Sequence, residues 1–226
     1  MTVGGVLSQA WVLYRAHWRH FIPLAFAFYV VLSLATTLAF GIVGALISAL
    51  VSLIGFFWLQ GALTEAVDDV RDGRADRSIT ETFRAVQPRI WALLAAGVLA
   101  VFGIAVGLVL LIVPGLLLLT WWSLVVPVIV LEQRGVLESF GRSRELVRGH
   151  GWTVFGVVIV TVLISLVVGA LIGGALLWLP EELRTFLSDV VSGSITAPFG
   201  ALAWTLMYFH LREPQETPVS ASPTFH

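Results

Sequence analysis

The fold is decided by residues 90–131, which read IWALLAAGVLAVFGIAVGLVLLIVPGLLLLTWWSLVVPVIVL. This run carries no charged side chain. Because a helix needs about 20 apolar residues to span the hydrocarbon core of a bilayer, the run is long enough for two spans joined by a turn. Proline removes a backbone donor and clashes with the preceding helical turn, so we expect the helix break at Pro114 and Gly115.

Three further charge-free runs repeat the pattern, at 21–64, 151–180 and 190–209. The first of these is again long enough for two spans, and Gly41 and Gly44 are the candidates for its turn. Together the runs predict an all-α membrane bundle of six spans in three hairpins. The expected spans are 19–40, 44–66, 88–112, 115–132, 151–178 and 190–211.

The same pattern predicts one transmembrane domain over residues 1–212. Residues 213–226 hold three prolines among small polar residues, a composition that favours disorder because it offers little apolar surface to bury. We therefore expect 213–226 to form a disordered cytoplasmic tail.

The composition excludes several classes of protein. Hydrophobic residues make up 58% of the chain and charged residues 12%, with a mean hydropathy of +0.94, whereas a soluble domain carries about 25% charged residues. The net charge of −1 gives no support for nucleic-acid binding. The absence of cysteine excludes disulfides, thiol catalysis and thiolate metal sites. All 13 basic residues are arginine, which indicates a GC-rich coding sequence and a prokaryotic source.

The arginines predict the orientation. With the N-terminus inside, twelve of the 13 arginines fall in cytoplasmic segments and only Arg184 falls outside. Positively charged residues are retained on the cytoplasmic side of membrane proteins. The sequence therefore predicts a multi-pass plasma-membrane protein with both termini in the cytoplasm.

A short amphipathic segment precedes each hairpin. The three segments span residues 3–14 and begin again at Ser78 and at Gly135, with apolar residues recurring every three or four positions. This spacing is typical of helices that lie along a membrane surface. Two interpretations remain open: a threefold internal repeat, or the ordinary amphipathic character of linkers between hairpins.

Candidate functional residues gather at the cytoplasmic rim. Glu65 and Glu132 end the second and fourth spans, and on a helical wheel of 136–148 Arg144 lies on the apolar face while Arg142 lies opposite. An arginine on an apolar face must snorkel or find a partner. One hypothesis is that Arg144 pairs with Glu132 or Glu65; the other is that it lies at lipid phosphate.

The predicted spans carry no charged group near their centres, which argues against a proton-coupled pump because such groups mark ion pathways. His17 and His20 lack a third ligand at metal spacing, so we expect an interfacial role and neither a metal nor a cofactor. Gly103-x-x-x-Gly107 and Gly169-x-x-x-Gly173 are small-residue motifs that allow close helix packing.

One segment resembles a known family. From Pro127 the sequence matches the pattern P-x4-E-x2-G-x6-RS-x2-L-x2-G-x2-W, preceded by Pro114-Gly115 and followed by Tyr208-Phe-His-Leu-Arg212. These motifs resemble the membrane domain found beside glycerophosphodiester phosphodiesterases and its stand-alone relatives. In this sequence the pattern falls on Glu132, Gly135, Arg142, Ser143, Leu146, Gly149 and Trp152.

The resemblance implies a six-helix membrane domain and no phosphodiesterase activity. In that family the chemistry belongs to a separate soluble barrel domain, for which the fourteen residues after Arg212 leave no room, so no catalytic residue is carried over.

The sequence favours a non-enzymatic scaffold or accessory module at the interface of lipid and cytoplasm. Its expected partners are the bilayer, with anionic lipid head groups near Arg142 and Arg148, and a second copy of the chain or another membrane protein. A transporter for a lipid-like or apolar solute is the alternative, with helix discontinuities at Pro114-Gly115 and Gly173-Gly174.

Overall fold

The computed structural model describes residues 2–37, 41–71 and 79–216, and these residues form helices without strands. The helices are α1 (Val3–Thr37), α2 (Gly41–Arg71), α3 (Ile79–Val86), the 3₁₀ turn η1 (Gln87–Arg89), α4 (Ile90–Leu110), α5 (Ile112–Trp121), α6 (Val125–Leu131), α7 (Val136–Val147), α8 (Gly151–Ala175) and α9 (Glu181–Glu216). Six helical segments are long and apolar enough to cross a membrane. The predicted all-α bundle of six spans is confirmed.

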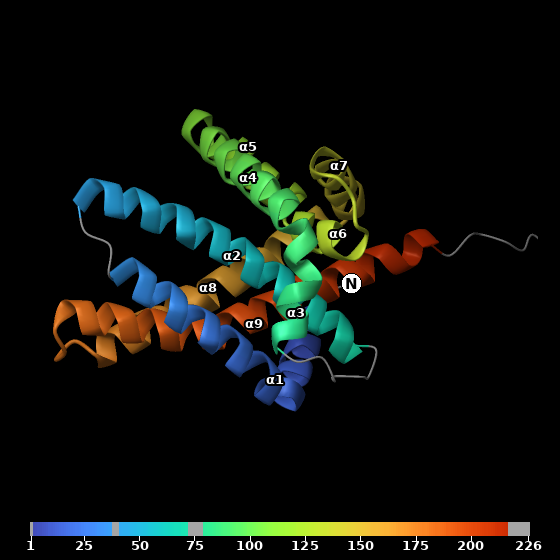
Figure 1. Ribbon diagram of the computed structural model, residues 1–226. Helices are drawn as coiled ribbons and strands as arrows, with labels where there is room; N and C mark the ends of the chain where they lie inside the picture. Colours follow the sequence, from blue (N-terminus) through green and yellow to red (C-terminus); the bar gives the residue numbers. More distant parts are fainter. Residues whose placement is uncertain (1, 38–40, 72–78, 217–226) are drawn as a thin grey trace, which may run out of the picture.

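The long helices form three antiparallel hairpins: α1 with α2, α4 with α5 and α6, and α8 with α9. Their connections alternate between two ends of the molecule. We call the end that holds α3, α7 and the ends of α2, α6 and α9 the arginine-rich end, and the opposite end the hairpin end. The helices meet at the arginine-rich end, and from there α4 and α5 diverge from the other two hairpins (Figure 1).

The core lies in the arginine-rich half. Its fully buried side chains include Phe21, Leu63, Leu146, Leu202 and Met207. Toward the hairpin end the same helices expose large apolar side chains, at positions that include Ile42, Val43, Leu46, Val109, Leu110 and Leu171. An exposed apolar surface of this extent is suited to lipid and not to water.

The break in the second hairpin lies a few residues earlier than expected. Leu111 is extended (φ −159°, ψ 136°), and Pro114 occupies the first turn of α5, not the break itself. Proline is tolerated in a first turn because its missing N–H would have no helical partner there. Gly115 instead lets α4 and α5 approach closely, since a Cβ at Gly115 would lie 2.4 Å from a side-chain carbon of Leu108.

In the first hairpin, α2 begins at Gly41 in the left-handed conformation (φ +71°). Gly44, the other candidate for the turn, lies inside α2. Residues 38–40 fall outside the described part of the chain.

The last span is longer than its charge-free core suggests. The helix α9 begins at Glu181 and continues to Glu216, so the expected start at 190 and the expected domain end at 212 both fall inside it. Glu213, which we placed in the disordered tail, binds Arg71 at 2.8 Å. Residues 217–226 of that tail lie outside the described residues.

The three amphipathic segments form helices. The first is the start of α1, which bends at His17 (φ −122°, ψ 22°) and buries Val6, Ala10 and Tyr14. The second and third are α3 and α7. All three lie at the arginine-rich end, beside the entrances to the next spans.

The two small-residue motifs differ in use. A Cβ at Gly107 would lie 2.9 Å from the Cα of Gly115, whereas a Cβ at Gly169 would meet nothing within 4 Å. The first motif therefore serves packing inside this chain, between α4 and α5.

Gly107→Ala should lower the stability of the folded protein by about 1–3 kcal/mol, because the two backbones must separate to admit the methyl group. Gly169→Ala is the matched control and should leave stability unchanged or raise it slightly, since alanine is the better helix former. Thermal melting of both variants in detergent measures the difference. Equal losses would contradict the packing role of Gly107.

Candidate functional site

Glu132, directly after α6, is the centre of a polar cluster at the arginine-rich end. Its carboxylate accepts hydrogen bonds from Arg134 Nε at 2.6 Å, from Arg142 Nε at 3.2 Å and from the hydroxyl of Tyr208 at 3.0 Å. The Tyr208 oxygen in turn accepts a hydrogen bond from Arg212 Nη1 at 3.1 Å. The cluster joins the ends of α6, α7 and α9.

The carboxylate of Glu132 is only 8% exposed and the Arg142 side chain 15%. Burial alone would raise the pKa of the Glu132 carboxyl, but the hydrogen bonds from Arg134 and Arg142 and the charge of Arg142 outweigh it and lower the pKa. The pair therefore stays charged, and each member depends on the other for its solvation.

The hypothesis that Arg144 pairs with Glu132 or Glu65 is wrong. Arg142 pairs with Glu132, and Glu65 pairs with Arg89 at 3.5 Å. The helical-wheel argument took the apolar face of 136–148 as the buried one, yet Leu137 is 77% exposed and the buried positions include Ser139 and Ser143. The buried face of α7 therefore includes Ser139 and Ser143, and it differs from the face that hydrophobicity alone indicates.

The buried side chain of Ser143 forms two hydrogen bonds to the backbone of the fourth span. The fourth span is broken between α5 and α6, and Ser143 donates to the carbonyl of Trp121 at 2.6 Å while its oxygen accepts from the N–H of Leu124 at 3.2 Å. Both backbone groups lose their helical partners at the break. One fully buried hydroxyl on α7 satisfies them together. Pro127, in the first turn of α6, was the sequence signal for this break, because its ring clashes with the carbonyl four residues earlier and it has no N–H to continue the helix.

The glycines of the segment shape the connections of α7. Gly135 precedes α7 as its N-cap residue, and its carbonyl accepts from the N–H and the hydroxyl of Ser139. Gly149 adopts φ +87° between α7 and α8, a conformation that residues with a side chain rarely take. Trp152, at the start of α8, is exposed, as an interfacial tryptophan is.

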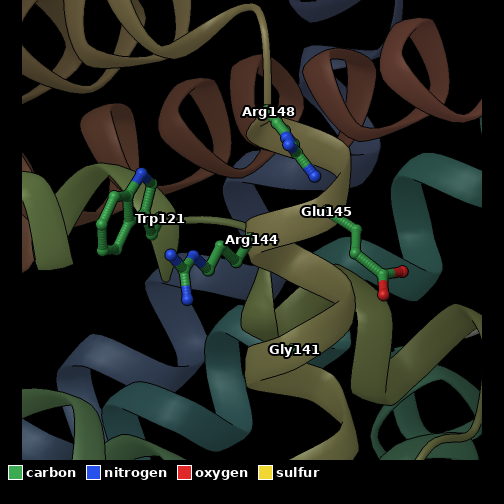
Figure 2. Close-up of a pocket in the computed structure, with 5 residues that line it drawn as sticks. All are labelled: Trp121, Gly141, Arg144, Glu145 and Arg148. Carbon is green, nitrogen blue, oxygen red and sulfur yellow. The ribbon is translucent and has the colours of Figure 1, made fainter.

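The outer side of α7 borders a basic pocket of about 620 Å³, lined by Trp121, Gly141, Arg144, Glu145 and Arg148. Figure 2 shows Arg144 reaching toward Trp121, Arg148 on the next turn of the same helix, and Glu145 pointing to the other side. The Arg144 guanidinium lies 4.4 Å from the centroid of the Trp121 ring. Within the described residues, neither Arg144 nor Arg148 forms an ion pair.

An apolar groove of about 560 Å³ adjoins the basic pocket, and the two share Trp121. The groove runs between α5 and α8 and is lined mainly by Val113, Leu116, Leu117, Trp152 and Phe155. We call the basic pocket and this apolar groove together the α5–α7–α8 site. Its two parts present cationic and apolar surfaces side by side.

Among the described residues, no three His, Cys, Asp or Glu side chains lie close enough to hold a metal ion. Of the residues expected at the site, Arg142 and Ser143 face inward to hold the helices, and Arg144, Arg148, Gly149 and Trp152 border the α5–α7–α8 site. Glu65 lies apart, in its own ion pair.

Comparison with known proteins gives one match. The model of a family described as a domain of unknown function, DUF7847, matches residues 3–211. No curated protein and no solved structure matches the chain. The match carries no link to the membrane domain of glycerophosphodiester phosphodiesterases, so that resemblance stays a prediction.

Glu132→Gln should lower stability by about 3 kcal/mol, because it leaves the buried Arg142 without a counter-charge. Glu145→Gln is the matched control: Glu145 also contacts Arg142, at 3.6 Å, but is 70% exposed, and an exposed pair contributes less than about 1 kcal/mol. Melting in detergent compares the two. A larger loss for Glu145→Gln would refute the central role of Glu132.

Ser143→Ala should cost about 1–3 kcal/mol for the buried backbone groups of Trp121 and Leu124 that lose their partner. Ser139→Ala is a control on the same helix, since Ser139 is equally buried but bonds only to the Gly135 carbonyl one turn earlier. We expect Ser139→Ala to be nearly neutral in the same melting experiment. Indistinguishable midpoints would show that the Ser143 hydroxyl is not required at the break.

Proposed function

Since the chain belongs to the DUF7847 family, whose function is unknown, we propose that it is a non-enzymatic membrane module that binds an anionic lipid at the arginine-rich end. The observation that carries this proposal is the α5–α7–α8 site, where a pocket with two arginines opens beside an apolar groove. A phospholipid has the same two parts, an anionic phosphate and acyl chains.

Arg144 and Arg148 are suited to the phosphate. Arg144 lies in the last turn of α7, Arg148 directly follows the helix as its C-cap residue, and both line the basic pocket (Figure 2). Arginine presents a planar set of donors that matches phosphate oxygens. Trp121 stacks against Arg144 at 4.4 Å and would hold its guanidinium in place, because an arginine over an indole face is stabilised by the ring electrons.

The groove between α5 and α8 is suited to an acyl chain. Leu116, Leu117 and Phe155 form an apolar surface, and burying a methylene group contributes about 0.8 kcal/mol. Trp152, with its exposed ring at the start of α8, lies where head groups meet hydrocarbon. A lipid held this way would have its phosphate at α7 and its chain along α5.

The proposal includes an orientation. Of the 11 arginines that the structure describes, all but Arg184 belong to the arginine-rich end, which we place in the cytoplasm of a prokaryotic cell, at the plasma membrane, with both termini on that side. The cytoplasmic leaflet is rich in anionic lipids, which attract basic residues at about 1 kcal/mol each near the surface. Lipid of the expected charge would thus be available at the site.

A transporter for a lipid-like solute is the second candidate. The break between α5 and α6, directly beside the groove, supports it, because interrupted helices often frame binding sites in transporters. The other discontinuity that we expected, at Gly173 and Gly174, lies inside α8 and gives no support. This candidate requires flux of a labelled lipid in proteoliposomes above the flux in empty vesicles.

An Arg144→Gln/Arg148→Gln double variant should retain less anionic lipid through purification. Loss of two basic contacts, about 2 kcal/mol, corresponds to about thirtyfold weaker binding. Native mass spectrometry of protein loaded with phosphatidylglycerol measures the bound fraction.

The matched control is an Arg15→Gln/Arg19→Gln double variant, which removes the same charge at the same end of the molecule without touching the site. It should bind nearly as well as the unchanged protein. If both double variants lose lipid equally, the attraction is a general effect of charge and the α5–α7–α8 site is not the binding site.

A further inference from the structure

A second cavity, of about 310 Å³, lies among α1, α2, α8 and α9, far from the arginine-rich end. Polar residues contributed by all four helices line it: Tyr29, Ser52, Ser165, Asp189, Ser192 and Thr196. At 1.5 Å per residue, Asp189 lies about 12 Å along α9 from its start at the hairpin end, and Ser165 about 15 Å from the end of α8. Both positions lie inside helices that are long and apolar enough to cross a membrane.

Three hydroxyl groups of this cavity are available as hydrogen-bond acceptors. Ser165 donates to the carbonyl of Thr161, Ser192 to that of Ser188, and Thr196 to that of Ser192. Each hydroxyl has a single proton, and in these three the proton is used inside its own helix. Their oxygens therefore offer lone pairs to whatever occupies the cavity.

Asp189 adds a negative charge to those acceptors. Within the described residues it has neither an ion pair nor a hydrogen bond. A carboxylate at this depth is costly unless something compensates it, and such groups mark ligand or ion pathways in membrane proteins. Asp189 was not among the candidate residues, because the last span was expected to begin one residue later, at 190, whereas α9 begins at Glu181.

Tyr29 supplies an aromatic wall. Its ring lies so close to α9 that a Cβ at Gly193 would lie 2.4 Å from it, so the glycine admits the ring to the cavity. An aromatic ring, a carboxylate and acceptor oxygens together are the surroundings that ammonium groups favour.

We propose that this cavity binds a small ammonium group. A bare ion would fill only a small part of 310 Å³, whereas cavities that bind organic molecules begin at about 300 Å³. The ammonium group belongs either to a free amine or to the head group of an aminophospholipid. The site is separate from the α5–α7–α8 site, and the proposal does not depend on lipid binding there.

Equilibrium dialysis of the full chain in neutral detergent against radiolabelled ethanolamine, whose protonated amine can donate to the acceptor oxygens, tests the proposal. We expect saturable binding that weakens about tenfold or more in Asp189→Asn, which keeps the shape of the side chain and removes its charge. Glu182→Gln removes a carboxylate near the start of α9 that does not line the cavity and should bind as the unchanged protein does. Thr196→Val, which removes one acceptor at nearly constant volume, should weaken binding by a smaller factor.

A second arm distinguishes the source of the ammonium group. Binding of phosphatidylethanolamine over phosphatidylglycerol from mixed micelles, lost in Asp189→Asn, would support a head group when free ethanolamine does not bind. Absence of Asp189-dependent binding in both arms would overturn the proposal. Displacement of ethanolamine by an equal concentration of sodium would overturn it as well, because the site would then select only for charge.

Discussion

Glu132 holds the arginine-rich end together, since one carboxylate accepts from groups on a loop, on α7 and on α9. Arg134, Arg142 and Tyr208 all donate to this nearly buried carboxylate. Displacing α7 or α9 would leave a buried charge or hydroxyl without its hydrogen-bond partner, so few other arrangements of these helices are stable. The polar pairing therefore sets where α7 lies against α6 and α9. The basic pocket follows from it, because Arg144 and Arg148 face outward once Arg142 faces inward.

Much of the fold could be predicted from hydrophobicity. The six spans and three amphipathic helices follow from charge-free runs and helical periodicity, which are properties of the chain alone. The exact ends could not be predicted: Leu111 breaks the second hairpin where Pro114 was the expected signal, and α9 extends past both of its expected limits. Helix ends depend on contacts such as Arg71 with Glu213, between residues far apart in the sequence.

The site was predicted in part. The segment from Glu132 to Trp152 contains residues that join α6, α7 and α9, but the hypothesis that Arg144 pairs with Glu132 or Glu65 was wrong: Arg142 pairs with Glu132, and Arg144 stacks on Trp121. A wheel ranks faces by hydrophobicity and cannot know that Ser143 is drawn inward by the unpaired backbone groups of another helix. Asp189 was missed because a charge was taken to end the span, although in the structure Asp189 lies within α9 and lines a cavity together with hydroxyl groups of other helices.

The exposed apolar side chains of the hairpin end have an evolutionary consequence. Where a side chain such as Val109 or Leu171 faces lipid, one aliphatic residue serves as well as another, and mutation can exchange them freely. We expect selection on residue identity to be strongest where close packing or a polar contact requires one residue type, as at Gly107, Glu132 and Ser143. Distant relatives would then share little sequence over most of their length. Their common origin would be visible mainly in the short polar segment around Glu132 and Ser143, between two spans.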